Sequence, residues 1–302
     1  MSEVSSERFS GHESFVCRYG WLPKIFRAVS ATPMLLKSEE SAMTTLGIGR
    51  NMVKSLQFWA ETSGVIEADG AGGHRPSQVG ALLFGPAGWD PHLESVESLW
   101  LIHWRLTTRA NLAAWNAVFG EGKLIRFDRP RLISALAQRG AGASRTLATS
   151  TLEQHASILI NSYLPSARNN DDTSWCPMQD LGVLKVTSTD DGRLSYNSSI
   201  SAPVGLSARV FGLALVDYIT RQRNGSGSVD LKTFLRGDYS PGIVFRLDEH
   251  QLRQYIEFLV SGPLGSALRF VDTADTQSLV LEPQQLDPQH RAWVNEEMHE
   301  HA

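Results

Sequence analysis

Two predicted helices joined by a glycine turn most constrain how this chain folds. Ser38 is a good N-cap for the first helix, and Glu39 and Glu40 follow in its first turn, where carboxylates stabilise the helix dipole. Gly47 is expected to end that helix, because glycine adopts the left-handed cap conformation at little cost. A second helix is predicted from Arg50 to residue 62.

The second predicted helix is amphipathic and precedes a predicted hairpin. At about 100° per residue, one side carries the apolar residues Met52, Val53, Leu56, Trp59 and Ala60. The other side carries Arg50, Asn51, Lys54, Phe58 and Glu61. A strand-like segment at residues 65–67 then leads through a glycine-rich tip to a returning segment. Helix, glycine turn, helix and hairpin in this order are typical of a winged helix-turn-helix.

In that fold the second helix enters the major groove of DNA, where polar side chains contact base edges or phosphates. The candidate DNA-contacting residues on this helix are Arg50, Asn51, Lys54, Ser55 and Gln57. His74 and Arg75, at the predicted hairpin, are expected to reach the DNA backbone or a minor groove. Winged helices also serve as protein-docking or dimerisation modules. In addition, the negative charge of Glu61 on the polar face would repel DNA phosphates. Both interpretations therefore stay open.

The overall charge gives no electrostatic argument for nucleic acid. The chain has 302 residues, a net charge of -4 and a pI near 6.1, so any DNA affinity has to come from a local basic patch. No apolar run approaches the roughly 20 residues of a membrane span, and the N-terminus lacks a signal sequence. A cytoplasmic protein that does not contact a membrane is therefore expected.

The helix-then-hairpin pattern recurs twice more along the chain. Residues 128–198 read as helix, loop, helix and hairpin, and residues 207–281 repeat the outline. The predicted fold class is mainly α with small β-hairpins (α+β), built from tandem winged helix-turn-helix-like units. The expected domains are residues 1–90, 91–200 and 201–302. In the middle region, a second candidate phosphate-binding face, if the fold brings its members together, consists of Arg139, Arg145 and Arg193.

Several residues with reactive side chains are expected to have structural roles. His12 is expected to tie the N-terminal arm to the body of the protein through hydrogen bonds. His103 lies among tryptophans on a predicted packed helix, which favours a hydrogen-bonded core histidine. Cys17 and Cys176 form no CxxC pair, so buried free thiols are expected.

The sequence gives no positive sign of an enzyme. It contains no GxSxG, HExxH or P-loop motif, and no GxGxxG followed by a correctly placed acidic residue. Two aspartate pairs, residues 171–172 and 190–191, lie in predicted loops, where turn chemistry explains them. No metal site, cofactor or catalytic residue is therefore predicted.

Several motifs together resemble a known bacterial family. They are FSGHESF, RYGWLPK, LGIGRNMVKSLQFWAETSGVI, GWDPHLE with LWLIHWRL, TLEQHASILINSYLP, CPMQDLGVL and SPGIVFRLDE. From Phe9 to about Leu281 the chain is similar to domain-of-unknown-function family 4007. Members of this family commonly sit beside genes for cysteine desulfurase and for a phosphoadenosine-phosphosulfate-reductase-like enzyme. The resemblance implies these two enzymes as partners and DNA phosphorothioation, an antiphage modification in which sulfur replaces a non-bridging phosphate oxygen, as the pathway.

The favoured hypothesis combines the residues with the resemblance. It describes a non-catalytic DNA-binding component of a phosphorothioation-linked antiphage defence system, which engages double-stranded DNA and either positions the sulfur-transfer enzymes or senses the modification. One alternative is a transcriptional regulator of the same gene cluster, which predicts a homodimer on one promoter site. The other is a protein-docking adaptor that never touches DNA.

Overall fold

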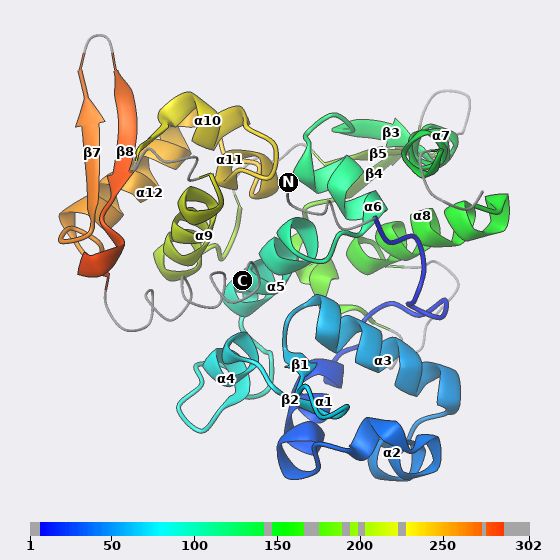
Figure 1. Cartoon of the computed structure of the whole chain (residues 1–302). Coiled ribbons are helices and arrows are strands. Elements are labelled where there is room, and N and C mark those ends of the chain that lie inside the picture. The colour runs from blue at the N-terminus through cyan, green and yellow to red at the C-terminus, as the bar shows by residue number, and fades with distance from the viewer. Residues whose placement is uncertain are drawn as a thin grey trace. The chain divides into compact units, whose positions relative to one another are not determined.

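The computed structural model describes residues 7–141, 147–165, 175–188, 194–198, 203–222, 228–273 and 276–286. The chain divides into two compact units: residues 1–118 with 123–199, and residues 119–122 with 200–302 (Figure 1). The expected domain boundary at residues 90 and 91 lies inside the first unit. Both units are mixed α and β, with small antiparallel sheets. Within the described residues, no helix is long and apolar enough to cross a membrane.

The first unit begins with the predicted helices and hairpin. The elements are α1 (Trp21–Ala31), η1 (Leu35–Lys37), α2 (Glu39–Leu46), α3 (Arg50–Thr62), β1 (Ile66–Ala68), β2 (His74–Pro76) and α4 (Gln78–Phe84). Ser38 caps α2 by accepting a hydrogen bond from the backbone N–H of Ser41, as predicted. Gly47 ends α2 in the left-handed conformation, with φ of 63°. The glycine turn therefore sets the angle at which α3 leaves α2.

The rest of the first unit is a helical body with a three-stranded sheet. Its elements are α5 (Val96–Thr108), α6 (Ala113–Trp115), β3 (Arg126–Asp128), α7 (Arg129–Gly140), α8 (Thr149–Tyr163), η4 (Pro177–Leu181), β4 (Lys185–Ser188) and β5 (Leu194–Asn197). The π-helical turn η2 (Asn116–Gly120) begins in this unit, and its last two residues are assigned to the second unit. The sheet has the order β3–β5–β4 and is antiparallel throughout. The helical segment is interrupted between α5 and α6, where Asn111 has φ of 51°.

The tryptophans of this body form its core, as the sequence predicts. Trp100, Trp104 and Trp115 are completely buried. His103 is also buried, and its Nδ1 lies 2.7 Å from the hydroxyl of Tyr163. The prediction of a hydrogen-bonded core histidine is confirmed.

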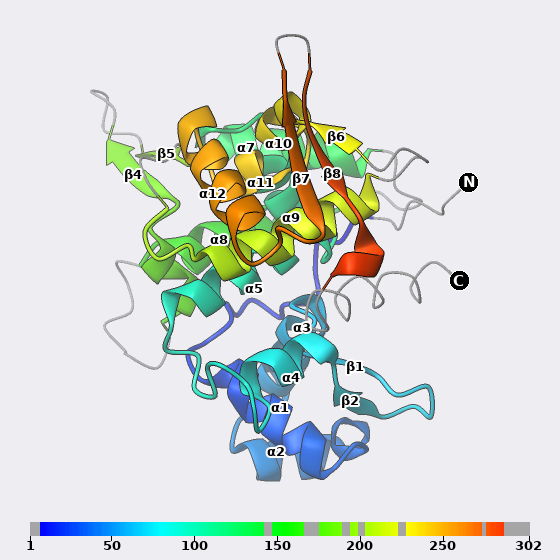
Figure 2. The same cartoon turned by 90° about the vertical axis from the view of Figure 1, so that its left-hand side faces the viewer.

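The second unit contains helices and another three-stranded sheet. Its elements are α9 (Ala208–Arg221), β6 (Ser228–Asp230), α10 (Leu231–Arg236), α11 (Pro241–Val244), α12 (Glu249–Ser261), β7 (Leu268–Asp272), β8 (Gln277–Leu281) and η5 (Pro283–Gln285). The sheet order is β6–β8–β7, and α12 packs beside the β7–β8 hairpin (Figure 2). Asp248 begins α12 with a capping box that includes Gln251.

The two three-stranded sheets share one topology. In each, a single strand precedes the helices, a hairpin follows them, and the last strand of the hairpin lies in the middle of the sheet. The helices that directly or nearly precede the three hairpins are α3, α8 and α12. These helices occupy equivalent places in the chain order, so their exposed surfaces can be compared.

Candidate nucleic-acid interface

The N-terminal half of α3 is the exposed part of the predicted DNA-contacting helix. Arg50, Asn51 and Lys54 are all exposed there. Glu39 of α2 contacts both cations: Arg50 Nε lies 2.9 Å from one carboxylate oxygen, and Lys54 Nζ lies 3.8 Å from the other. All three side chains are at least half exposed, so these ion pairs contribute little to stability. They do lower the local positive charge that DNA would meet.

Two predicted contact residues on α3 make hydrogen bonds to other groups of the protein. Ser55 is completely buried, and its hydroxyl donates a hydrogen bond to the backbone oxygen of Phe15 at 3.4 Å. Ser55 therefore has no access to DNA, and its assignment to the contact surface is corrected. Gln57 is half-buried, and its amide donates to Glu61 Oε1 at 2.7 Å.

The N-terminal arm, residues 7–20, covers the second half of α3 and explains this burial. Phe58, which the helical wheel places on the polar face, is buried beneath the arm. The guanidinium of Arg8 lies 4.6 Å from the centre of its ring, and His12 makes an edge contact with it. Gly11 has φ of +113°, and a Cβ at that position would lie 2.5 Å from the Phe58 ring. Only a glycine allows the arm to pass this closely.

The same arm is anchored to α6 and α7. The backbone N–H of Arg8 donates to the oxygen of Asn111 at 2.7 Å, and Ala113 donates back to Arg8 at 3.1 Å. Arg139 of α7 donates from Nε to both carboxylate oxygens of Glu7, at 2.9 and 3.1 Å. Arg139 therefore anchors the arm, and its assignment to a phosphate-binding face is corrected. Arg145 and Arg193, the other two members of that face, lie outside the described residues.

A buried pair of histidines joins the arm to α8. His12 Nε2 lies 3.2 Å from His155 Nδ1, and the two rings stack with centroids 5.4 Å apart. His155 Nε2 accepts the backbone N–H of Ala114, so its proton is on Nδ1 and is donated to His12. Burial lowers the pKa of His12 to about 4, and burial together with His12 lowers that of His155 to about 3. Both rings are neutral at pH 7 and sealed from solvent, so the prediction that His12 ties the arm to the body is confirmed.

The hairpin residues predicted to contact DNA are paired with carboxylates. His74 Nε2 lies 2.8 Å from Glu61 Oε1, and the His74 side chain is 16% exposed. Arg75 is exposed and lies 2.7 Å from Glu67 on the neighbouring strand. Arg75 therefore faces solvent, whereas His74 is held against the end of α3.

The sheet of the first unit contains an additional cationic row that sequence reasoning missed. Arg126 and Lys185 both pair with Asn197 of the central strand, so the three side chains lie on one face of the sheet. The opposite face carries Phe127 and Tyr196, which are buried. Arg126 and Lys185 are exposed and have no ion pair within the described residues. The sequence could not predict this pair of cations, because the strand register brings together two residues that are about 60 positions apart.

The described residues contain neither a cluster of metal-binding side chains nor an exposed thiol. No group of three or more histidine, cysteine, aspartate or glutamate residues gathers in this part of the chain. Cys17 and Cys176 are free and buried, as predicted. Burial raises the pKa of the Cys176 thiol to about 12 and that of Cys17 well above its usual range. Neither thiol is a nucleophile at neutral pH.

Comparison with known proteins places this geometry in a family. The chain is similar to a structure described as "Magnesium ion-bound SspB crystal structure", with 25% identity, a TM-score of 0.82, and coverage of 98% of this chain and 88% of the other. A second structure, described as "SspB crystal structure", is 24% identical with a TM-score of 0.81 and the same coverage. No curated protein matches the chain. A family model described as "Protein of unknown function (DUF4007)" matches residues 9–296, and the chain therefore belongs to the DUF4007 family.

Proposed function

We propose that this chain is a DNA-binding component of a phosphorothioation-linked antiphage defence system. The observation that carries the proposal is the exposed cationic end of α3, which follows a glycine turn and precedes a hairpin. Arg50, Asn51 and Lys54 present one guanidinium, one amide and one ammonium group on neighbouring turns. These are the groups that contact phosphates and base edges in DNA-reading helices.

The chain order supports tandem winged helix-turn-helix-like units. α2, the Gly47 turn and α3 form the helix-turn-helix, and β1 and β2 form the wing. The other two hairpins close sheets in which the strand before the helices pairs with the last strand. This arrangement fits winged-helix domains, in which the helix before the wing is the reading helix.

Two surfaces of the first unit are proposed to share the DNA phosphates. Glu39 is only weakly held by Arg50 and Lys54, so a DNA phosphate competes with it for the same cations. Arg126 and Lys185 lie about two strand spacings apart, roughly 10 Å, on the exposed face of the sheet. They supply sequence-independent contacts, which position a protein on DNA without reading it.

The proposed pathway rests on the resemblance to the family. Membership of the DUF4007 family supports the gene neighbourhood of sulfur-transfer enzymes that the sequence motifs imply. Cysteine desulfurase and the phosphoadenosine-phosphosulfate-reductase-like protein are the proposed partners. The sulfur chemistry belongs to them, because the two thiols of this chain are buried with raised pKa values.

A salt series tests the DNA contact. Affinity for a random duplex is measured by fluorescence anisotropy for the wild type and for Arg50→Ala with Lys54→Ala. The slope of log affinity against log salt is expected to become shallower by about 1.8, because each lost phosphate contact removes about 0.9. Arg269→Ala is the matched control, since Arg269 is 65% exposed and pairs with Glu282 as Arg50, 64% exposed, pairs with Glu39. Unchanged affinity and slope in the double variant would place the contact elsewhere.

A second candidate function is magnesium-dependent cleavage of a DNA strand. It is favoured by the magnesium ion in one of the similar structures, since bound Mg²⁺ assists displacement at phosphorus. The described residues offer no cluster of carboxylates that fits such an ion, so no catalytic step is assigned to any residue. Incubation of supercoiled plasmid with Mg²⁺, and with EDTA as the control, separates the two candidate functions. Nicked, open-circular plasmid formed only with Mg²⁺ would show strand cleavage and overturn the non-catalytic proposal.

A further inference from the structure

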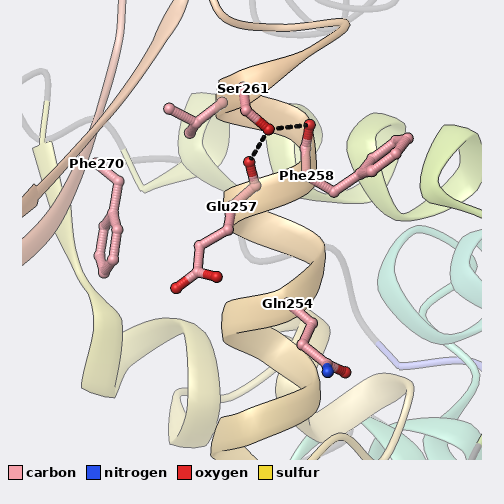
Figure 3. A pocket seen from close by; sticks show the side chains of 6 residues that line it. Gln254, Glu257, Phe258, Ser261 and Phe270 are labelled. Atoms are coloured by element: carbon pink, nitrogen blue, oxygen red, sulfur yellow. Dashed lines mark hydrogen bonds between the residues drawn. The ribbon is translucent and has the colours of Figure 1, made fainter.

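The outer surface of α12 carries two adjoining hollows. One, of about 610 Å³, is lined by Gln254, Glu257, Phe258, Val260, Ser261 and Phe270 (Figure 3). The second, of about 390 Å³, shares Gln254 and Phe258 and extends to Pro203, Ala208 and Tyr255. Because the two hollows share Gln254 and Phe258, they adjoin on the exposed face of α12, and we call the two together the α12 groove.

Phe258 is the residue that makes this groove unusual for a surface helix. The inner stripe of α12, Leu252, Ile256 and Leu259, is completely buried or nearly so. Phe258 lies outside that stripe and is 56% exposed, the most exposed phenylalanine in the part of the chain described. Figure 3 shows it projecting from one side of α12, while Glu257 and Phe270 lie on the other. Burial of a phenylalanine side chain is favourable, so an exposed one beside apolar residues favours contact with a partner.

The charge of the α12 groove is negative. Arg253, the one cation of α12, pairs with Glu249 at 3.3 Å and with Asp272 at 3.0 Å. The carboxylate of Glu257 has no ion pair with any described residue, and neither hollow is lined by a cation. The surface therefore combines an uncovered aromatic ring with an uncompensated carboxylate. This combination repels DNA phosphates and complements an apolar segment that carries a positive charge.

We propose that the α12 groove binds an amphipathic helix of a partner protein, with a lysine or arginine beside its apolar stripe. The apolar stripe covers Phe258, and the cation lies against Glu257. A helix fits because the residues that line the groove are spread along α12, as in other helix-in-groove complexes. The proposal goes beyond DNA binding and gives the second unit a separate task, which is to hold another protein.

Site-specific crosslinking tests the proposal in the full chain. The photoreactive residue p-benzoylphenylalanine replaces Phe258 in cells that express the native gene neighbourhood, and the crosslinked peptide is identified by mass spectrometry. The expected product is an apolar helical segment of another protein with an adjacent lysine or arginine. The same probe at Tyr19, which is 50% exposed and lies in the first unit, is the control. Products that link two copies of this chain, or that do not exceed the Tyr19 control, would overturn the proposal.

Charge reversal then tests the role of Glu257. A peptide of the crosslinked segment is expected to bind the wild type at least tenfold more tightly than Glu257→Lys, and replacing the peptide's cation with glutamate is expected to restore binding to that variant. Phe258→Ala is expected to lose peptide binding and to keep DNA affinity. Both positions are exposed, so thermal melting of the variants is expected to match that of the wild type. Equal peptide affinity for wild type and Glu257→Lys would refute the complementary-charge argument.

Discussion

Acidification from pH 8 to pH 5 is expected to destabilise the first unit through the buried pair of His12 and His155. Both imidazoles are neutral in the folded protein, with pKa values lowered from 6.5 to about 4 and about 3. Below pH 6.5 both histidines bind protons in the unfolded chain but stay neutral in the folded chain, so the free energy of unfolding falls as pH falls. Each histidine then costs about 2 kcal/mol at pH 5 relative to pH 8, or about 4 kcal/mol for the pair.

Urea unfolding at each pH measures this loss, with tryptophan fluorescence as the signal. Seven of the eight tryptophans precede residue 176, and Trp115 lies 6.1 Å from the ring of His155, so the signal reports on the first unit. The other acidic and basic groups also titrate, and a variant with His12→Gln and His155→Gln subtracts their contribution. The wild type is expected to lose about 4 kcal/mol more than this variant between pH 8 and pH 5.

His92→Gln, at an exposed position in the same unit, is the matched control and is expected to follow the wild type. The double variant starts from a lower stability at pH 8, because it changes packing around Phe58 and the contact with Ala114. The comparison therefore rests on the change with pH and not on the absolute values. Parallel pH profiles for the wild type and the double variant would refute the assignment of two neutral buried imidazoles.

Three further predictions concern the arm and the core. Cys17 and Cys176 are expected to resist Ellman's reagent in the native protein at pH 8 and to react only in denaturant, because both are buried with raised pKa values; rapid labelling of the folded chain would contradict this. Gly11→Ala is expected to cost about 1–3 kcal/mol in urea unfolding, since its methyl group would collide with Phe58 and the backbone has positive φ. Arg139→Ala is expected to release the arm and raise amide hydrogen exchange at residues 8–15, because it removes the guanidinium that pairs with the carboxylate of Glu7. Unchanged exchange would show that the backbone hydrogen bonds of Arg8 are enough to hold the arm.

Local patterns predicted the helices well, because caps and glycine turns act within a few residues. The Ser38 cap, the Gly47 stop and the start of α3 at Arg50 all agree with the structure. The hairpin that ends at residue 281 was also expected, as the end of the third helix-then-hairpin segment. What the local patterns did not contain was the third strand of each sheet: β3 and β6 are three residues long and pair with strands more than 45 positions away.

The candidate site was predicted less well, because the helical wheel treats a helix as if only one side were covered. It placed Phe58 on the polar side of the helix, and Ser55 was among the candidate DNA-contacting residues, whereas the arm buries both. The residues that hold the arm, Glu7 and Arg139, are 132 positions apart, and nothing local to either one indicates their contact. The apolar side of the wheel is largely buried as expected, and on the polar side the start of α3 is exposed as expected.

The three helices that precede the hairpins therefore differ in what they offer a partner. On α3, Arg50 and Lys54 face solvent, whereas α8 contains no lysine or arginine and is held by the arm through His155. On α12, the exposed groups include Phe258 and the carboxylate of Glu257, which has no ion pair with a described residue. A protein that read DNA with all three helices would need positive charge on each, because phosphate contacts dominate nucleic-acid affinity. Under the proposed function, this distribution of charge favours the start of α3 as the DNA contact, an internal packing role for α8 and a protein partner for α12.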